Sequence, residues 1–179
     1  MTDGFPRELI SAIQEGRAAL FLGAGASRGA LHPSGDPMPD GRALAVALAE
    51  AFLGTDYTDL DFRTAYDLCC SMRDVRTVQR RVFEILNPFQ PADFHELIPK
   101  FSWAGIATTN YDQIIERAYK RASERVQTLV PNLKDGDGAA DSISDKGQLY
   151  VRLHGCITKY QEVDPPFIAS TEQLISYRT

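Results

Sequence analysis

The sequence lacks long apolar runs, a leader-like start and a large set of cysteines. None of its 179 residues lies in an apolar stretch approaching the roughly 20 residues of a membrane-spanning helix, which excludes such a helix. The first residues contain neither a basic nor an apolar stretch, so we expect no signal peptide. The three cysteines, Cys69, Cys70 and Cys156, neither make a disulfide framework nor show the CxxC spacing of zinc sites. We therefore expect free thiols, a reducing cytoplasm and no bound metal.

The chain is also poor in positive charge. It has 19 Lys and Arg against 24 Asp and Glu, for a net charge of −5. A protein that binds a nucleic-acid duplex needs clustered cations that displace counterions, so this balance disfavours nucleic acid as a partner. The only dense basic cluster is Arg76, Arg80 and Arg81. We expect this domain to bind neither nucleic acid nor a membrane.

Apolar content is ordinary, with 44% hydrophobic and 24% charged residues. Such a composition can bury enough apolar surface to offset the ordering entropy, which excludes a disordered chain. At this length we expect one domain that spans residues 1–179.

Short apolar runs alternate with helical patterns. Runs typical of strands in a parallel sheet lie at 18–22, 105–109 and 149–153, with a shorter one at 128–130. Apolar stripes with helical spacing lie at 42–53, 75–86 and 111–122. This alternation predicts an α/β fold with a mostly parallel sheet flanked by helices.

The spacing of Ser170 and Gln173 is that of a capping box, which predicts that a helix begins there. Because the sequence stops at Thr179, before that helix could finish packing, we expect a domain truncated at its C-terminus.

Two segments, 30–41 and 131–147, have loop composition. The second contains Asp135, Asp137 and Asp141 but lacks the glycine and the final glutamate of a calcium loop. We interpret it as a solvated surface loop.

A glycine-containing turn, Gly23-Ala24-Gly25-Ala26-Ser27, directly follows the first apolar run. Glycines at this place let the backbone turn tightly and approach a phosphate, with N–H groups facing the anion. Gly29 comes one residue too late for the dinucleotide motif GxGxxG, and no GK[ST] of a Walker loop follows. On these residues alone, a phosphate-binding loop and a plain strand-to-helix turn both stay open.

The segment Thr108-Thr109-Asn110-Tyr111-Asp112 follows the second apolar run, at the edge where ligands of open parallel sheets bind. Asn110 could orient a ribose or a water with its amide, and Asp112 could fix the loop or a ribose hydroxyl. The alternative is that Thr109 or Asn110 caps the next helix, while Asp112 favours its positive end.

The third polar segment, Leu153-His154-Gly155, ends another run. An imidazole accepts a proton near neutral pH, as a general base must, and the neighbouring glycine leaves room for a substrate. We interpret the other two histidines, His32 and His95, as surface or satisfied core residues.

In this order, Gly-Ala-Gly-Ala-Ser at 23–27, Thr-Asn-Tyr-Asp at 109–112 and Leu-His-Gly at 153–155 resemble the sirtuin-like NAD-binding family. The resemblance covers nearly the whole chain. It is closest to the bacterial branch found in antiphage-defence systems rather than to protein deacylases.

This resemblance implies a Rossmann-like domain that binds NAD and breaks its bond to nicotinamide. Carried over by position, Asn110 would hold the nicotinamide ribose and the attacking water, and His154 would act as a base. Asp112 would support the ribose, and Thr109 belongs to the same NAD-binding motif. The residues implied to cradle the pyrophosphate are Gly23, Ala24, Gly25 and Ser27.

Two departures from the family matter. Sirtuin deacylases carry a zinc module with two CxxC pairs, which this sequence lacks, so water is the expected acceptor. The family also continues with another strand near the adenosine half of NAD. The resemblance further implies an effector that a partner, a companion domain or assembly into a homo-oligomer activates.

We therefore predict an NAD glycohydrolase. The alternatives are a non-catalytic module that senses NAD or ADP-ribose, an NAD-dependent deacylase or ADP-ribosyltransferase, and a dehydrogenase. The presence of both Asn110 and His154 favours an enzyme, because a pure sensor needs no base.

Overall fold

The computed structural model describes residues 4–132, 147–161 and 168–176. Within these residues, four strands form one parallel sheet in the order β1-β2-β4-β3. They are β1 (Ala19–Leu22), β2 (Gly105–Thr108), β3 (Thr128–Asn132) and β4 (Gly147–Arg152). Leu22 pairs with Thr108, and Thr108 with Arg152, so β1, β2 and β4 end at the same edge. The predicted α/β, Rossmann-like fold with a parallel sheet flanked by helices is confirmed.

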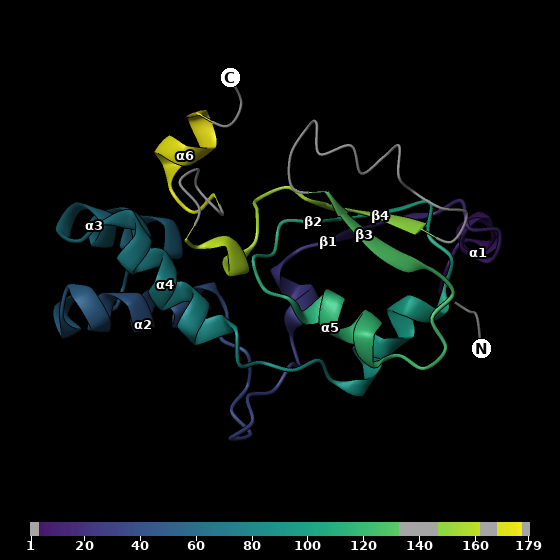
Figure 1. The fold of residues 1–179 in the computed structure, drawn as a ribbon, viewed down its shortest axis with the longest axis horizontal. Coiled ribbons are helices and arrows are strands. Elements are labelled where there is room, and N and C mark those ends of the chain that lie inside the picture. Colours follow the sequence, from purple (N-terminus) through teal and green to yellow (C-terminus); the bar gives the residue numbers. More distant parts are fainter. Residues whose placement is uncertain (1–3, 133–146, 162–167, 177–179) are drawn as a thin grey trace.

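Figure 1 shows how the helices lie around the sheet. Three of them, α2 (Gly41–Phe52), α3 (Phe62–Met72) and α4 (Val75–Leu86), lie together beside the sheet and are called the helical group below. Helix α5 (Ile114–Arg121) lies against the sheet through Ile115 and Tyr119. The α-helices are α1 (Arg7–Gln14), α2 (Gly41–Phe52), α3 (Phe62–Met72), α4 (Val75–Leu86), α5 (Ile114–Arg121) and α6 (Thr171–Ser176). Short 3₁₀ helices are η1 (Ala24–Ser27), η2 (Thr55–Tyr57), η3 (Asp93–Lys100) and η5 (Ile157–Lys159).

The three grouped helices begin in the same way. An aspartate side chain, from Asp40, Asp61 or Asp74, accepts a hydrogen bond from a backbone N–H in the first turn of α2, α3 or α4. Each carboxylate thereby satisfies a donor that has no partner inside the helix and lies near the positive end of the helix dipole.

Most predicted boundaries hold within one or two residues. The stripes at 42–53 and 75–86 correspond to α2 and α4. The predicted capping box is confirmed, because Gln173 N–H donates to Ser170 Oγ and Ser170 N–H donates to Gln173 Oε1. The helix predicted over 111–122 is wrong at its start. It begins at Ile114, because the Asp112 carboxylate accepts the N–H of Ile114 and the residues before it form a turn.

The predicted loop at 30–41 contains only isolated bridges, from Leu31 to Pro37 and to Gln90. Asp135, Asp137 and Asp141 lie outside the described residues. In the described parts of the chain, no helix is long and apolar enough to cross a bilayer.

The core has two main clusters. One joins α2, α3 and α4 to residues beyond β4, and its members are Leu44, Leu48, Tyr66, Cys69, Val78, Val82, Leu86, Ile157 and Ala169. The other lies between the sheet and α5 and contains Leu22, Ile106, Ile115, Tyr119 and Tyr150. Ile157 packs among the helices although it directly follows the turn after β4. The helical group is therefore fixed against the edge where the strands end.

We expect Leu48→Ala to lower the free energy of unfolding by about 2–5 kcal/mol, because Leu48 is fully buried and the truncation leaves a cavity. Urea denaturation followed by circular dichroism measures the loss. Leu68→Ala is the matched control, since Leu68 on α3 is 38% exposed. Equal losses in the two variants would contradict the assignment of this core.

Candidate functional site

A cavity of about 880 Å³ lies between the strand ends and the helical group. Its volume is in the range of about 300–1,000 Å³ that is usual for small-molecule sites. Sequence-predicted site residues that line it are Ala24, Gly25, Ser27, Thr109, Asn110, Asp112 and His154. Gly23 is not among the lining residues, and its carbonyl accepts the N–H of Ala26 inside the turn. The structure thus brings three distant motifs together around one space, while their roles toward a ligand stay predictions.

The glycine turn is open on the cavity side. A Cβ added at Gly25 would meet no heavy atom within 4 Å, so the space on the side-chain side of this residue is open. No hydrogen bond within the described part of the chain uses the N–H groups of Ala24 and Gly25. These two donors are available to an anionic ligand that approaches the turn.

His95 holds this turn from behind. It is 1% exposed. Its Nδ1 accepts the N–H of Ala92 at 3.0 Å, which leaves Nε2–H to donate to the carbonyl of Ala26 at 2.8 Å. The interpretation of His95 as a satisfied core histidine is confirmed.

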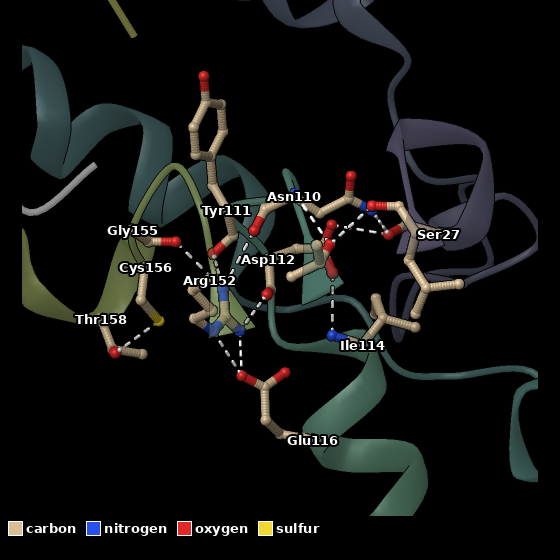
Figure 2. Close-up of polar contacts among 12 residues, drawn as sticks. Ser27, Asn110, Tyr111, Asp112, Ile114, Glu116, Arg152, Gly155, Cys156 and Thr158 are labelled. Carbon is tan, nitrogen blue, oxygen red and sulfur yellow. Dashed lines mark hydrogen bonds and ion pairs between the residues drawn. The ribbon is translucent and has the colours of Figure 1, made fainter. Parts of the chain in front are cut away.

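A buried polar network connects the first two motifs (Figure 2). Asn110 Nδ2 donates to Ser27 Oγ at 2.9 Å, and Ser27 Oγ donates to Asp112 Oδ2 at 2.7 Å. The three residues are at most 9% exposed. Because the Ser27 proton goes to Asp112, the serine orients the Asn110 amide instead of offering its O–H to a ligand.

The network decides how Asn110 faces the cavity. Its amide nitrogen is turned toward Ser27, so the opposite oxygen, Oδ1, is the end left to accept a hydrogen bond from a water or a hydroxyl (Figure 2). Its own N–H is held by the hydroxyl of Thr108, which donates to the carbonyl of Leu22. Asn110 therefore does not cap α5. Asp112 does satisfy the N–H of Ile114, as the alternative interpretation of this residue proposed.

His154 is half-buried at the cavity wall. Burial, followed by the nearby positive charge of Arg63, lowers the pKa of His154, and a hydrogen bond to the backbone carbonyl of Thr109 opposes this shift. The lowered pKa favours the neutral ring at pH 7, which is the form that can accept a proton. The adjacent Gly155 has a φ of 80°, a backbone conformation that favours glycine. The turn itself therefore requires a glycine here, in addition to the space that it leaves beside His154.

Arg152, which the sequence interpretation did not single out, lies behind the site at 2% exposure. Its guanidinium donates to the backbone carbonyls of Asn110, Tyr111, Asp112 and Gly155. It also pairs with Glu116 of α5. Although burial opposes its charge, the Glu116 carboxylate raises the pKa of Arg152. The available signal was a lone charge within an apolar run, just before His154.

Another missed part of the site is the wall opposite the strand ends. It consists of Pro37, Met38, Pro39, Asp40 and Gly41, together with Phe62 of α3 and Leu86 of α4. The signal was the proline-rich loop that follows the glycine turn. Its composition predicts irregular backbone but not the surface that it covers.

Other sequence features lie elsewhere. Arg76 and Arg80 line a separate pocket with Tyr160. Cys69 is buried, Cys70 is half-buried, and the three cysteines are free thiols. Among the described residues, no group of three His, Cys, Asp or Glu side chains could hold a metal ion.

We expect Ser27→Ala to lower the free energy of unfolding by about 1–3 kcal/mol, because it leaves Asp112 Oδ2 and Asn110 Nδ2 buried without this partner. Chemical denaturation measures the effect. Ser71→Ala is the control, since the Ser71 hydroxyl donates to Leu68 at the exposed surface. A loss for Ser27→Ala no larger than that of the control would exclude the network as a stabilising element.

The comparisons with known proteins agree with this arrangement in part of the chain. No curated protein matches the sequence. Residues 104–177 match the model of the SIR2-like domain, a segment that contains Asn110, Asp112, Arg152 and His154. A SIR2-like domain implies a function related to NAD, and the parallel α/β sheet is consistent with it. The match supports a sirtuin-like family for this chain.

Proposed function

We propose that this chain is an NAD glycohydrolase domain, which cleaves NAD to nicotinamide and ADP-ribose. The observation that carries the proposal is the position of Asn110 and His154 on one cavity with the open glycine turn. An acceptor oxygen, a neutral imidazole and unpaired N–H donors are the groups that this reaction uses. The SIR2-like match over residues 104–177 adds support.

In the proposed reaction, the N–H groups of Ala24 and Gly25 bind the pyrophosphate. Asn110 Oδ1 accepts a hydrogen bond from the attacking water or from the nicotinamide ribose. The bond between the ribose carbon and the nicotinamide nitrogen breaks, and nicotinamide leaves as a neutral molecule. Water adds to the resulting oxocarbenium-like carbon, and its proton passes to His154. Positioning and polar stabilisation supply most of the catalysis in such a step.

We further propose that the domain acts as an effector in bacterial antiphage defence by depleting cytoplasmic NAD after a partner, a companion domain or assembly activates it. This part rests on the resemblance of the three motifs to that branch of the family. Release of nicotinamide from NAD is therefore to be measured with the longest obtainable protein, with and without candidate partners.

We expect the wild type to release nicotinamide and ADP-ribose from NAD, and His154→Ala to release neither, because the base is lost. Chromatography detects both products, and circular dichroism checks folding. Gly25→Val provides a second arm. Its side chain enters the empty cavity at a residue without positive φ, so we expect a folded protein that no longer binds NAD.

Gly105→Val is the control for added bulk, since it also meets open space but lies at the start of β2. Saturable NAD binding by calorimetry without nicotinamide, under every activation condition, would favour a sensing module. Equal NAD binding by wild type and Gly25→Val would remove the cavity as the binding site.

The lowered pKa of His154 gives a pH prediction. A base works when deprotonated, so kcat/KM should rise with pH through the His154 pKa and level off above it. Because the pKa is below the ordinary value of 6.5, the acid limb should lie below that pH. Arg63→Gln removes the positive charge that helps to lower this pKa, so the limb should move to higher pH. Arg17→Gln, far from the cavity, should leave it unchanged, and an unmoved limb in Arg63→Gln would exclude His154 as the titrating base.

A further inference from the structure

We infer that Arg152 is a positioning residue that fixes Asn110 and His154 relative to each other through backbone carbonyls. This inference rests on the proposed function. Arg152 does not line the 880 Å³ cavity, so it acts through the two loops and not on the substrate. Figure 2 shows its guanidinium between the turn of Asn110 to Asp112 and the turn at Gly155.

Every donor of the guanidinium is used. Nε donates to Glu116 at 2.8 Å, and Nη2 donates to Glu116 and to the Asp112 carbonyl at 2.7 Å. Nη1 is shared by the carbonyls of Asn110 at 3.1 Å, Tyr111 at 3.3 Å and Gly155 at 3.3 Å. A guanidinium has five N–H donors in a rigid plane, whereas an ammonium has three at one point. A lysine at this position cannot reach all four carbonyls and Glu116 together.

These contacts determine the direction of the peptide groups that carry the site. In a planar trans peptide the C=O of one residue and the N–H of the next point in opposite directions. With the carbonyls of Asn110, Tyr111 and Asp112 directed at Arg152, the following N–H groups point away from it. The loop that carries Asn110 therefore cannot rotate without losing contacts to Arg152. Gly155, one residue after His154, is held by the same plane.

The energetics favour a positioning role over a purely structural one. A buried ion pair contributes little net stability, because desolvation offsets most of its attraction. A well-packed apolar pair in the same place often stabilises the folded protein at least equally. An apolar pair could fill the space between β4 and α5. It could not collect carbonyl groups from two loops that follow different strands.

A second cavity of about 370 Å³ gives access to Arg152 from the other side. Its lining includes Glu116, Tyr119, Arg152, Cys156 and Thr158. In Arg152→Ala, a small soluble guanidinium can therefore enter the space that the side chain leaves. This access provides a test by chemical rescue.

We expect Arg152→Ala to lower kcat for nicotinamide release by about 100-fold, since displacements near 1 Å in a site have effects of this size. The KM for NAD should change much less, because no residue that lines the cavity is replaced. Millimolar methylguanidinium should restore part of kcat in a saturable way. Arg152→Lys should also lose kcat, and methylguanidinium should not rescue it because the lysine occupies the space.

Arg117→Ala is the matched control. Arg117 also donates to two backbone carbonyls, those of Asn87 and Phe89, but outside the site. We expect this variant to lose stability and to keep its kcat. A kcat loss in Arg152→Ala no larger than in Arg117→Ala, or a rescue of melting temperature without kcat, would overturn the positioning role.

Hydrogen exchange tests the positioning role without measuring activity, so it separates this inference from the proposed function. It also provides a test if Arg152→Ala does not fold. In Arg152→Lys, amide exchange should accelerate at 111–113 and 155–157 while the helical group is unchanged. If the wild type releases no nicotinamide under any condition, the proposed activity fails, and this exchange pattern alone decides the positioning role. Unchanged or uniformly faster exchange would overturn it.

Discussion

The buried guanidinium of Arg152 is the interaction on which the geometry of the site depends. It connects the loop after β2, the turn after β4 and, through Glu116, helix α5. Loops have many accessible conformations, and a cavity bounded by them needs a constraint from behind. One planar cation with five donors provides that constraint because backbone carbonyls from different directions can all contact it. Glu116 compensates the charge, which would otherwise be costly to bury.

The polar network of Ser27, Asp112 and Asn110 adds a second constraint, which acts on a side chain where the first acts on the backbone. Arg152 sets the backbone of the loop, and Ser27 sets the rotation of the Asn110 amide. The serine in turn depends on the glycine turn, whose Ala26 carbonyl is bound by His95. Ser27 Oγ, Asp112 Oδ2, Asn110 Nδ2 and both ring nitrogens of His95 each have a hydrogen-bond partner, as buried polar groups require. The end of the Asn110 amide that remains for a ligand is determined by these contacts.

The cavity itself is a product of how the helical group packs. Ile157, shortly after the turn that carries His154, is buried among α2, α3 and α4. This packing brings Phe62, Leu86 and the segment from Pro37 to Gly41 opposite the strand ends. The hydrophobic core therefore forms one wall of the cavity, and the carboxyl edge of the parallel sheet forms the other. Ligand sites are usual at this edge of open α/β sheets.

The sequence by itself determined the fold class and the convergence of the three motifs. Apolar periodicity identifies strands and helices because it reports which faces are buried. Parallel strands end at a common edge, so the residues after 22, 108 and 152 had to lie near one another. The start of α5 was misplaced by three residues, because periodicity does not show that Asp112 binds the N–H of Ile114.

Only the tertiary structure decided which partner each buried polar atom has. The hydroxyl of Ser27, a residue predicted to lie at the pyrophosphate, donates to Asp112, a contact that the sequence did not indicate. Arg152 stood in the sequence as a single charge inside an apolar run. Hydrogen-bond partners far apart in the chain depend on distances and directions that composition and spacing do not contain. The position of Pro37 to Gly41 in the cavity wall could not be predicted for the same reason, since a loop sequence shows where the chain turns but not which residues it faces.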